Sequence, residues 1–204
     1  MTMCLSAASP ASPHPDFLPL SALRGVVTDL RYACTDNFTG RNLYAGRDCA
    51  WLHREAAHAL QAAANALRQQ HSEHQLVVYD ALRPHQIQIA LWDFLAGTPL
   101  QMYVADPARG SIHSFGMAVD VSILDGEGRA LDMGTAFDAF DERSQPRLEQ
   151  AFLESGGLTA QQVANRHLLR DLMLDAGFHG IPTEWWHFNM GDPAQVRAVY
   201  PRID

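Results

Sequence analysis

The sequence predicts an α+β fold: a single domain in which helices flank a mostly antiparallel central sheet. Helical and strand-like segments follow one another irregularly, with hairpin signals, rather than in the strict alternation of a parallel sheet. The 204 residues can form one hydrophobic core, and 47% of them are hydrophobic. No repeat or linker-like stretch divides the chain after its beginning, so we assign residues 21–204 to one domain.

The first half of the chain contributes an arm, two helices and a strand. Residues 1–20 hold four prolines among small polar residues, which predicts a flexible N-terminal arm. A helix is expected over Asp48–Gln70, because Asp48 can cap it and its interior has an alanine-rich apolar stripe. Leu76–Tyr79 is typical of a buried strand, and Pro84 suits the first turn of a helix that ends near Leu95.

The second half contributes two strands and two helices. Ala118–Leu124 alternates between apolar and polar residues, which predicts a half-buried strand. The turn signal that follows, at residues 125–128, predicts a hairpin. The remaining segments are two helices and an aromatic-rich strand, expected over Pro146–Glu154, Thr159–Ala176 and Thr183–Asn189.

Charge and composition exclude several classes of partner. The net charge of −8 and the lack of a basic cluster argue against nucleic acid. No apolar stretch is long enough to cross a bilayer, so we expect no membrane association, and no feature specifies an oligomeric state. Three cysteines without a Cys-x-x-Cys pair argue against a disulfide framework. Because the N-terminus also lacks the pattern of a signal peptide, we predict a cytoplasmic protein.

Two short clusters contain residues of the types that bind metal ions. Ser111, His113 and Asp120 form the pattern Ser-x-His-(x)6-Asp, and the second cluster is Glu184-Trp-Trp-His187. Imidazole and carboxylate groups suit a tetrahedral zinc ion, and a catalytic zinc site has three protein ligands and one open position. The two clusters supply these ligands with a glutamate to spare. They therefore predict a catalytic zinc site with an activated water and a general base.

Local sequence features bear on whether these side chains can converge. Gly116 can adopt backbone angles closed to other residues, and a turn there would bring His113 beside Asp120. Glu184 and His187 are three residues apart, so a regular strand would point them to opposite faces of the sheet. Both can serve one site only if the strand is bulged, or if Glu184 lies at its irregular beginning.

Each of these residues also has an ordinary structural interpretation. A single His113 or His187 is more often a hydrogen-bonded histidine than a metal ligand, and Asp120 alone is more often a strand-end cap. An aromatic pair such as Trp185-Trp186 is more often part of a core than of a substrate wall. The combined spacing, rather than any single residue, favours the metal site.

The chain resembles the zinc D-alanyl-D-alanine dipeptidases associated with vancomycin resistance, within the larger family of D,D-carboxypeptidases. The segments that carry the resemblance follow the family's order between about Leu30 and Asn189: Tyr32 with Asp36-Asn-Phe-Thr-Gly40, Asp80-Ala-Leu-Arg83-Pro84, Met133-Gly-Thr-Ala-Phe137-Asp138, Phe140-Asp-Glu-Arg-Ser144, and the two clusters above. The resemblance implies the D,D-peptidase/hedgehog-like zinc fold and a bacterial enzyme.

The resemblance also implies roles for particular residues. His113, Asp120 and His187 are expected to bind one Zn²⁺ per chain. Glu184 is expected to be the catalytic base, and Arg83 to stabilise the developing oxyanion.

The substrate that the resemblance implies is the free dipeptide D-Ala-D-Ala, hydrolysed to two D-alanines by metal-activated water. Tyr32 and Asp138 are expected near its amino end, and Ser111 is expected to help hold it. A carboxylate at Asp138 would attract the ammonium of a free dipeptide, whereas a longer peptide would leave that buried charge unmatched.

Two other functions stay open from the sequence. A D,D- or L,D-carboxypeptidase acting on longer cell-wall peptides would use the same chemistry, and a non-catalytic zinc-binding module would use the same fold. The presence of both Glu184 and Arg83 argues against the module. His85 and His179 lie near the site segments in sequence, which assigns them no role.

Overall fold

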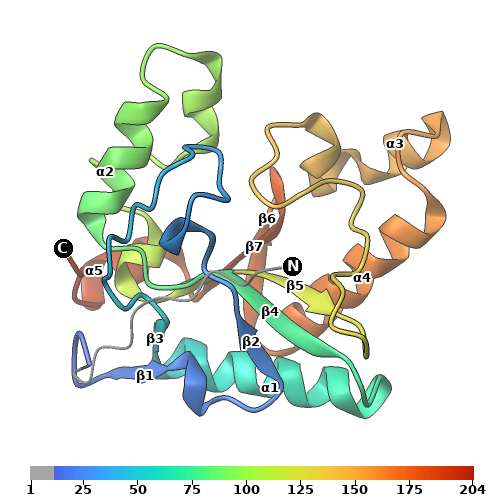
Figure 1. Cartoon of the computed structure of the whole chain (residues 1–204), viewed down its shortest axis with the longest axis horizontal. Helices are drawn as coiled ribbons and strands as arrows, with labels where there is room; N and C mark the ends of the chain where they lie inside the picture. The colour runs from blue at the N-terminus through green and yellow to red at the C-terminus, as the bar shows by residue number, and fades with distance from the viewer. Residues whose placement is uncertain (1–11) are drawn as a thin grey trace.

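The structure, a computed structural model, describes residues 12–204, and these form one α+β domain (Figure 1). The predicted fold class is confirmed. The strands are β1 (Phe17–Pro19), β2 (Val26–Thr28), β3 (Trp51–His53), β4 (Gln75–Asp80), β5 (Ala118–Leu124), β6 (Phe178–Ile181) and β7 (Glu184–Met190). The α-helices are α1 (Arg54–Gln70), α2 (His85–Phe94), α3 (Glu149–Ser155), α4 (Ala160–Asp175) and α5 (Pro193–Val199).

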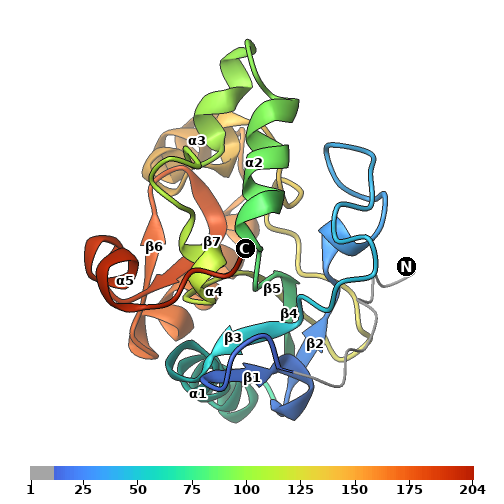
Figure 2. The same cartoon turned by 90° about the vertical axis from the view of Figure 1, so that its left-hand side faces the viewer.

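The larger of two sheets has the strand order β2-β4-β5-β7-β6. Its β2–β4 pairing is parallel and its other three pairings are antiparallel, as the mostly antiparallel prediction requires. Helices α1 and α4 pack against each other, and in Figure 1 α2 and α3 stand above the sheet on either side. Figure 2 shows the small β1–β3 sheet beside α1, at the end of the molecule away from the tip of α2.

Strand β5 is buried on both faces, whereas its alternating pattern predicted a half-buried strand. All seven of its residues are buried, including the polar Asp120 and Ser122. A fully buried face obliges its polar groups to find partners within the protein. The chain turns back after β5 as predicted: Leu124 forms an antiparallel bridge with Ala130, and backbone hydrogen bonds join Asp125 to Arg129 and Leu131 to Ile123, so the hairpin is present but short.

The predicted N-terminal arm, residues 1–20, includes residues that belong to the folded domain. Residues 1–11 lie outside the described part of the chain, but Phe17–Pro19 pair with β3 as strand β1. Phe17 and Leu20 are buried, and the removal of these apolar side chains from water accounts for the ordered pairing.

The long N-terminal helix begins later than predicted. Helix α1 starts at Arg54, because Trp51–His53 are engaged in pairing with β1. The side chain of Asp48 accepts a hydrogen bond from the backbone of Ala50 instead of capping the helix. The cap is His53, whose ring nitrogen accepts from the backbone N–H of Glu55.

The later predicted elements are present, with small shifts at their ends. Thr159 caps α4 as expected and forms a reciprocal capping box with Gln162. Helix α3 begins at Glu149, after a short 3-10 turn over Pro146–Leu148. Strands β2 and β6 and helix α5 were not predicted from the sequence.

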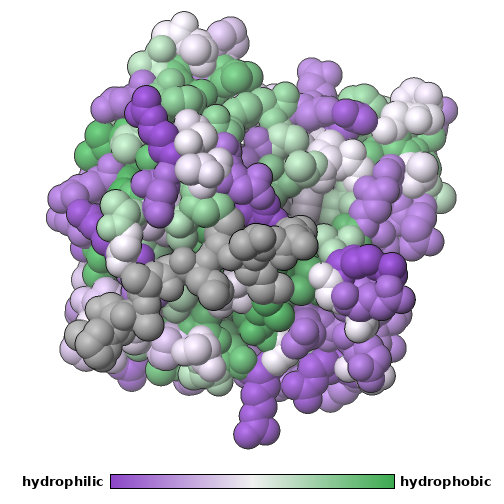
Figure 3. All heavy atoms as spheres, viewed as in Figure 1, coloured by the Kyte–Doolittle hydropathy of each residue, from purple (hydrophilic) through white to green (hydrophobic). Residues whose placement is uncertain are grey.

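The described residues also bear on the predictions about membrane association and about cysteines. Within residues 12–204 no helix is long and apolar enough to cross a bilayer. Large exposed apolar side chains occur on and after α2, at Phe94 and Met102. Figure 3 shows a hydrophobic area at its upper left, where Figure 1 places α2. Cys49 is buried and free, whereas Cys34 is disulfide-bonded, which the odd number of cysteines did not lead us to expect. Cys4 lies outside the described residues.

Candidate metal centre

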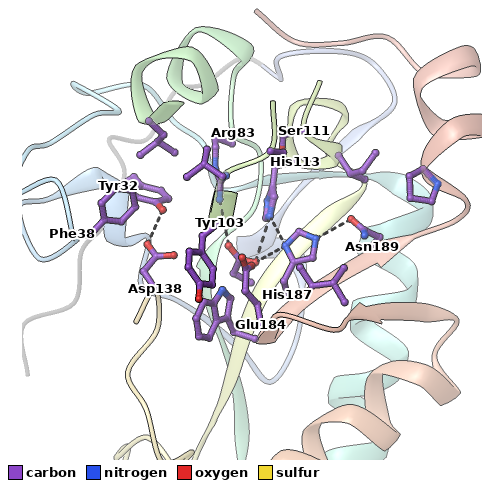
Figure 4. A pocket seen from close by; sticks show the side chains of 18 of the residues that line it. Tyr32, Phe38, Arg83, Tyr103, Ser111, His113, Asp138, Glu184, His187 and Asn189 are labelled. Carbon is purple, nitrogen blue, oxygen red and sulfur yellow. Dashed lines mark hydrogen bonds and ion pairs between the residues drawn. The ribbon is translucent and has the colours of Figure 1, made fainter. Parts of the chain in front are cut away.

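One cavity of about 290 Å³ gathers every residue that the sequence analysis named for the site. Its walls include Tyr32, Arg83, Ser111, His113, Asp120, Asp138, Glu184 and His187. In Figure 4, Tyr32 and Asp138 lie on one side of His113, and Asn189 lies on the other. The volume is near the lower end of that of small-molecule sites, about 300–1,000 Å³, and suits a small ligand.

Three side chains bring ligand atoms within reach of a single ion. His113 Nε2 lies 3.2 Å from His187 Nδ1, and Asp120 Oδ1 lies 3.4 Å from the first nitrogen and 3.0 Å from the second. Tetrahedral ligands with metal bonds of about 2.0–2.1 Å lie about 3.3 Å from one another. The spacing of this trio, His113, Asp120 and His187, therefore fits one tetrahedral ion.

The outer hydrogen bonds of the two imidazoles determine which nitrogens carry hydrogen. His113 Nδ1 lies 2.9 Å from the carbonyl oxygen of Ala81, and His187 Nε2 lies 2.9 Å from Oδ1 of Asn189. Both partners are acceptors, so these outer nitrogens donate and the inner nitrogens keep their lone pairs. Two lone pairs and a carboxylate that face one another repel unless a cation lies between them. The group of ligand atoms thus fits a metal ion.

The polypeptide places these ligand atoms through one tight turn and one strand pairing. His113 lies in the 3-10 segment η4 (Ile112–Phe115), which ends at Gly116 with a φ of 63°. A Cβ at position 116 would collide with the ring of Phe17, so the turn requires glycine, as expected. Asp120 on β5 and His187 on β7 are direct cross-strand partners.

Glu184 and His187 line the same cavity because β7 is paired irregularly at its start. The β6–β7 register shifts so that Ile181 pairs with Glu184 while Gly180 pairs with Phe188. This shift is the irregularity that the three-residue spacing required. It brings the Glu184 side chain to the cavity without making it one of the three converging ligand groups.

The Glu184 carboxyl lies in surroundings that favour its neutral form. Burial raises its pKa to about 8, and the carboxylates of Asp120 and Asp138 act in the same direction, against the imidazole of His187. A carboxyl with such a pKa can both accept and return a proton near neutral pH. A cation held by the trio would lower this pKa.

Arg83 is fixed beside the trio by buried polar groups. Its Nε donates to Asp80 Oδ2 at 2.7 Å, and its terminal nitrogens reach Gln88 Oε1 at 3.0 Å and Asp120 Oδ2 at 3.4 Å. The guanidinium carbon lies 5.2 Å from the centre of the Tyr32 ring. A positive charge held in this way can stabilise negative charge that develops on a ligand in the cavity.

Tyr32 and Asp138 form the acidic end of the cavity. The Tyr32 hydroxyl donates to Asp138 Oδ2 at 2.6 Å. Asp138 has a φ of 57°, a left-handed conformation that is uncommon outside glycine and marks a constrained position. Burial raises its pKa to about 7, although the hydrogen bond from Tyr32 acts in the opposite direction. A cationic group entering this end would favour the ionised carboxylate.

An aromatic wall lines the cavity beside Tyr32, whose ring lies 6.2 Å from that of Phe38. The rings of Phe38 and Phe140 lie 5.1 Å apart and those of Tyr103 and Phe140 5.6 Å apart, and all three residues line the cavity. They come from three separate segments of the chain.

The sequence analysis missed residues that support the site. Asp80 is fully buried and holds Arg83, and its place three residues before Arg83 at the end of β4 was the available signal. Asn189 follows His187 by two, the spacing that puts both side chains on one face of a strand. His85 and His179 do not line the cavity, and His179 is exposed on β6.

Comparisons with known proteins match most of the chain. The model of peptidase family M15, described as D-ala-D-ala dipeptidase, matches residues 16–203. The D-alanyl-D-alanine dipeptidase of Escherichia coli (strain K12) is 42% identical over 166 residues, which are 81% of this chain and 79% of that protein. The enzyme of the same name from Enterococcus faecium is 28% identical over 200 residues, with 87% and 92% covered. The solved structure of the LdcB LD-carboxypeptidase aligns with 96% of this chain and 78% of its own, at 16% identity and a TM-score of 0.48.

Proposed function

The chain belongs to the D-Ala-D-Ala dipeptidase family of peptidases, and we propose that it hydrolyses free D-Ala-D-Ala to two D-alanines. The observation that carries this proposal is the convergence of His113, Asp120 and His187 beside Glu184 in one cavity. In the reaction, water adds across the single peptide bond. One alanine gains a carboxylate and the other leaves with an ammonium group.

We propose that the metal is one zinc ion per chain, held by His113, Asp120 and His187. Two imidazole nitrogens and one carboxylate oxygen are a set that suits zinc. Ala81 and Asn189 support this role, since they hold both rings with unprotonated nitrogens turned inward. When bound, zinc supplies Lewis acidity that polarises the scissile carbonyl and lowers the pKa of a water molecule.

Glu184 and Arg83 carry out the remaining chemistry. Glu184 takes a proton from the attacking water and passes it to the nitrogen of the leaving alanine. Arg83 places its fixed charge near the carbonyl oxygen, which becomes negative as the carbon becomes tetrahedral. Loss of such a stabilising group typically costs on the order of 100-fold or more in rate.

Selectivity for a free dipeptide follows from the acidic end of the cavity. The ammonium of the substrate pairs with Asp138, which Tyr32 holds in place. A peptide that continues beyond this point carries no ammonium there and meets the wall formed by Phe38 and Phe140. It would leave the Asp138 carboxylate buried without a partner, which is penalised.

Replacing Glu184 with alanine tests the proposed chemistry. Release of D-alanine is expected to fall by roughly 10²–10⁴-fold, the usual contribution of a general acid–base. Zinc content should stay at one per chain, because Glu184 is not among the converging ligands. Glu127→Ala, which removes an exposed turn glutamate, is the matched control and should change neither quantity. Full activity in zinc-loaded Glu184→Ala would contradict the proposal.

A comparison of free and N-acetylated D-Ala-D-Ala separates the alternatives. We expect efficient hydrolysis of the free dipeptide alone. Efficient cleavage of the acetylated form would indicate a carboxypeptidase that acts on longer wall peptides. Stoichiometric zinc with no turnover of any D-amino-acid peptide would indicate a non-catalytic module.

A further inference from the structure

The cavity carries positive charge at a place that the proposed chemistry does not use. Arg109 and Arg197 both line it, in addition to Arg83. Within residues 12–204 neither arginine comes within ion-pair distance of a carboxylate. Burial lowers the pKa of Arg197, and the nearby charge of Arg109 acts in the same direction, while the carboxylate of Asp192 acts against both. Two like charges that line a substrate cavity and form no ion pair with a carboxylate indicate a place for an anionic group.

Arg197 is the better oriented of the two. Arg197 lies on α5, and its Nε donates to the carbonyl oxygen of Gly110 at 3.0 Å. One of its terminal nitrogens donates to the carbonyl oxygen of Pro193 at 3.3 Å. These bonds anchor the guanidinium next to Ser111, a buried residue that also lines the cavity. The other terminal nitrogen forms no hydrogen bond with the described residues and stays available to a ligand.

The positions of these groups give the cavity two ends of opposite charge. Figure 4 shows Asn189 on the side of the trio away from Tyr32 and Asp138, and Ser111 next to His113. Arg197 adjoins Ser111 through its hydrogen bond to Gly110. A free dipeptide carries its ammonium and its carboxylate on opposite sides of the single peptide bond. With the ammonium at Asp138 and the scissile carbonyl at the trio, the carboxylate points toward Arg197.

We propose that Arg197 binds the carboxylate of the dipeptide and so selects substrates with a free C-terminus; this rests on the proposed function. Arginine suits this role because its planar fork can donate two parallel hydrogen bonds to a carboxylate. A different role is to fasten α5 to the segment before Ser111. A fastening role would affect all substrates equally, whereas carboxylate binding affects only those that carry the carboxylate.

The test compares D-Ala-D-Ala with its C-terminal amide in the natural chain and in Arg197→Gln. The natural chain should prefer the free acid. In Arg197→Gln we expect kcat/KM for the acid to fall by roughly 10- to 100-fold, mainly through KM, with little change for the amide. Arg197→Lys should recover part of the preference, because it keeps the charge but loses the fork. Arg202→Gln removes a charge from the C-terminal tail and should alter neither substrate.

Several outcomes would overturn the inference while leaving the proposed function intact. One is an equal loss for acid and amide in Arg197→Gln, which would indicate fastening alone. Another is equal cleavage of the amide and of the free acid by the natural chain. This measurement does not depend on the folding of any variant. Zinc content and thermal unfolding of each variant show whether its site is assembled. Absence of hydrolysis of the free dipeptide by the natural chain would instead contradict the proposed function.

Discussion

The buried carboxyl groups around the trio differ in what surrounds them. Burial alone would raise the pKa of Asp120, but positive charge beside it, carried by the rings of His113 and His187 when no metal ion is held, outweighs burial and holds that pKa below its ordinary range. Glu184 and Asp138 have no comparable compensation, and burial raises their pKa to about 8 and about 7. The site thus places an ionised carboxylate in the trio beside two carboxyl groups whose raised pKa lies near neutral pH.

Asp138 gives the reaction a specific pH dependence. The substrate ammonium pairs only with the ionised carboxylate, and a raised pKa of about 7 means that this form is lost as the pH falls from 8 to 6. KM for free D-Ala-D-Ala should therefore rise as the pH falls, approaching about tenfold per unit below the pKa.

Asp138→Asn is the matched comparison for this pH dependence. It should show a higher KM at pH 8 and little further change down to pH 6, because its amide does not titrate. The measurement is KM at several pH values and constant ionic strength for both proteins. Parallel slopes in the two proteins would assign the titration to another group.

At the scale of elements, periodicity located the long segments and failed at the short ones. The capped helix α4 and strand β5 have enough residues for a repeating pattern, and both were predicted. Strands β1 and β3 have three residues each, too few for periodicity. Their pairing depends on residues far along the chain, so the arm and the start of α1 were misplaced. The burial of the polar face of β5 likewise depends on what covers it.

Residue type and spacing predicted the trio and Glu184, whereas Tyr32, Arg83, Ser111 and Asp138 were named from the family resemblance. The eight residues named in the sequence analysis all line one cavity. The sequence analysis missed the residues that support the site, because each of them acts through a contact that exists only in the folded chain. Asp80 holds Arg83, the carbonyl of Ala81 orients His113, and Arg197 reaches the cavity from a helix that was not predicted.

The turn at Gly116 makes a short element essential to the site. Gly116→Ala would force alanine to a φ of 63°, which costs roughly 1–2 kcal/mol, and would add the collision with Phe17. Relief of that collision must move η4, and His113 with it. We expect a lower free energy of unfolding, by about 2 kcal/mol or more, together with weaker zinc binding.

Gly128→Ala separates backbone strain from displacement of the site. Gly128 also has a positive φ, 74°, but nothing lies within 4 Å of the added methyl group. Gly128→Ala should lower the free energy of unfolding only by the cost of the positive φ, and its zinc affinity should not change. Urea unfolding and zinc titration of both variants provide the measurement. Unchanged zinc affinity in Gly116→Ala would show that the turn does not position His113.

At the scale of the whole molecule, the trio joins parts of the chain that are distant in sequence. His113 precedes the central strand β5, Asp120 lies on it, and His187 comes from β7 near the C-terminal end. The carbonyl oxygen of Ala81, the residue that follows β4, accepts the hydrogen bond from Nδ1 of His113. A metal ion at this point therefore links three neighbouring strands of the main sheet, and its removal leaves three buried acceptors facing one another.

Metal removal should accordingly destabilise the fold as well as stop hydrolysis. An ion that binds only the folded chain, present at about 100 times its Kd, adds about 2.7 kcal/mol. For a chain of this size that corresponds to a rise of roughly 5–10 °C in Tm. A chelator should lower Tm by this amount, and added zinc should restore it. His187→Ala should abolish the zinc-dependent shift, whereas His179→Ala, which removes an exposed histidine outside the cavity, should retain it. If His187→Ala kept the full shift, zinc would be stabilising the protein from another site, since the proposed one would have lost an imidazole.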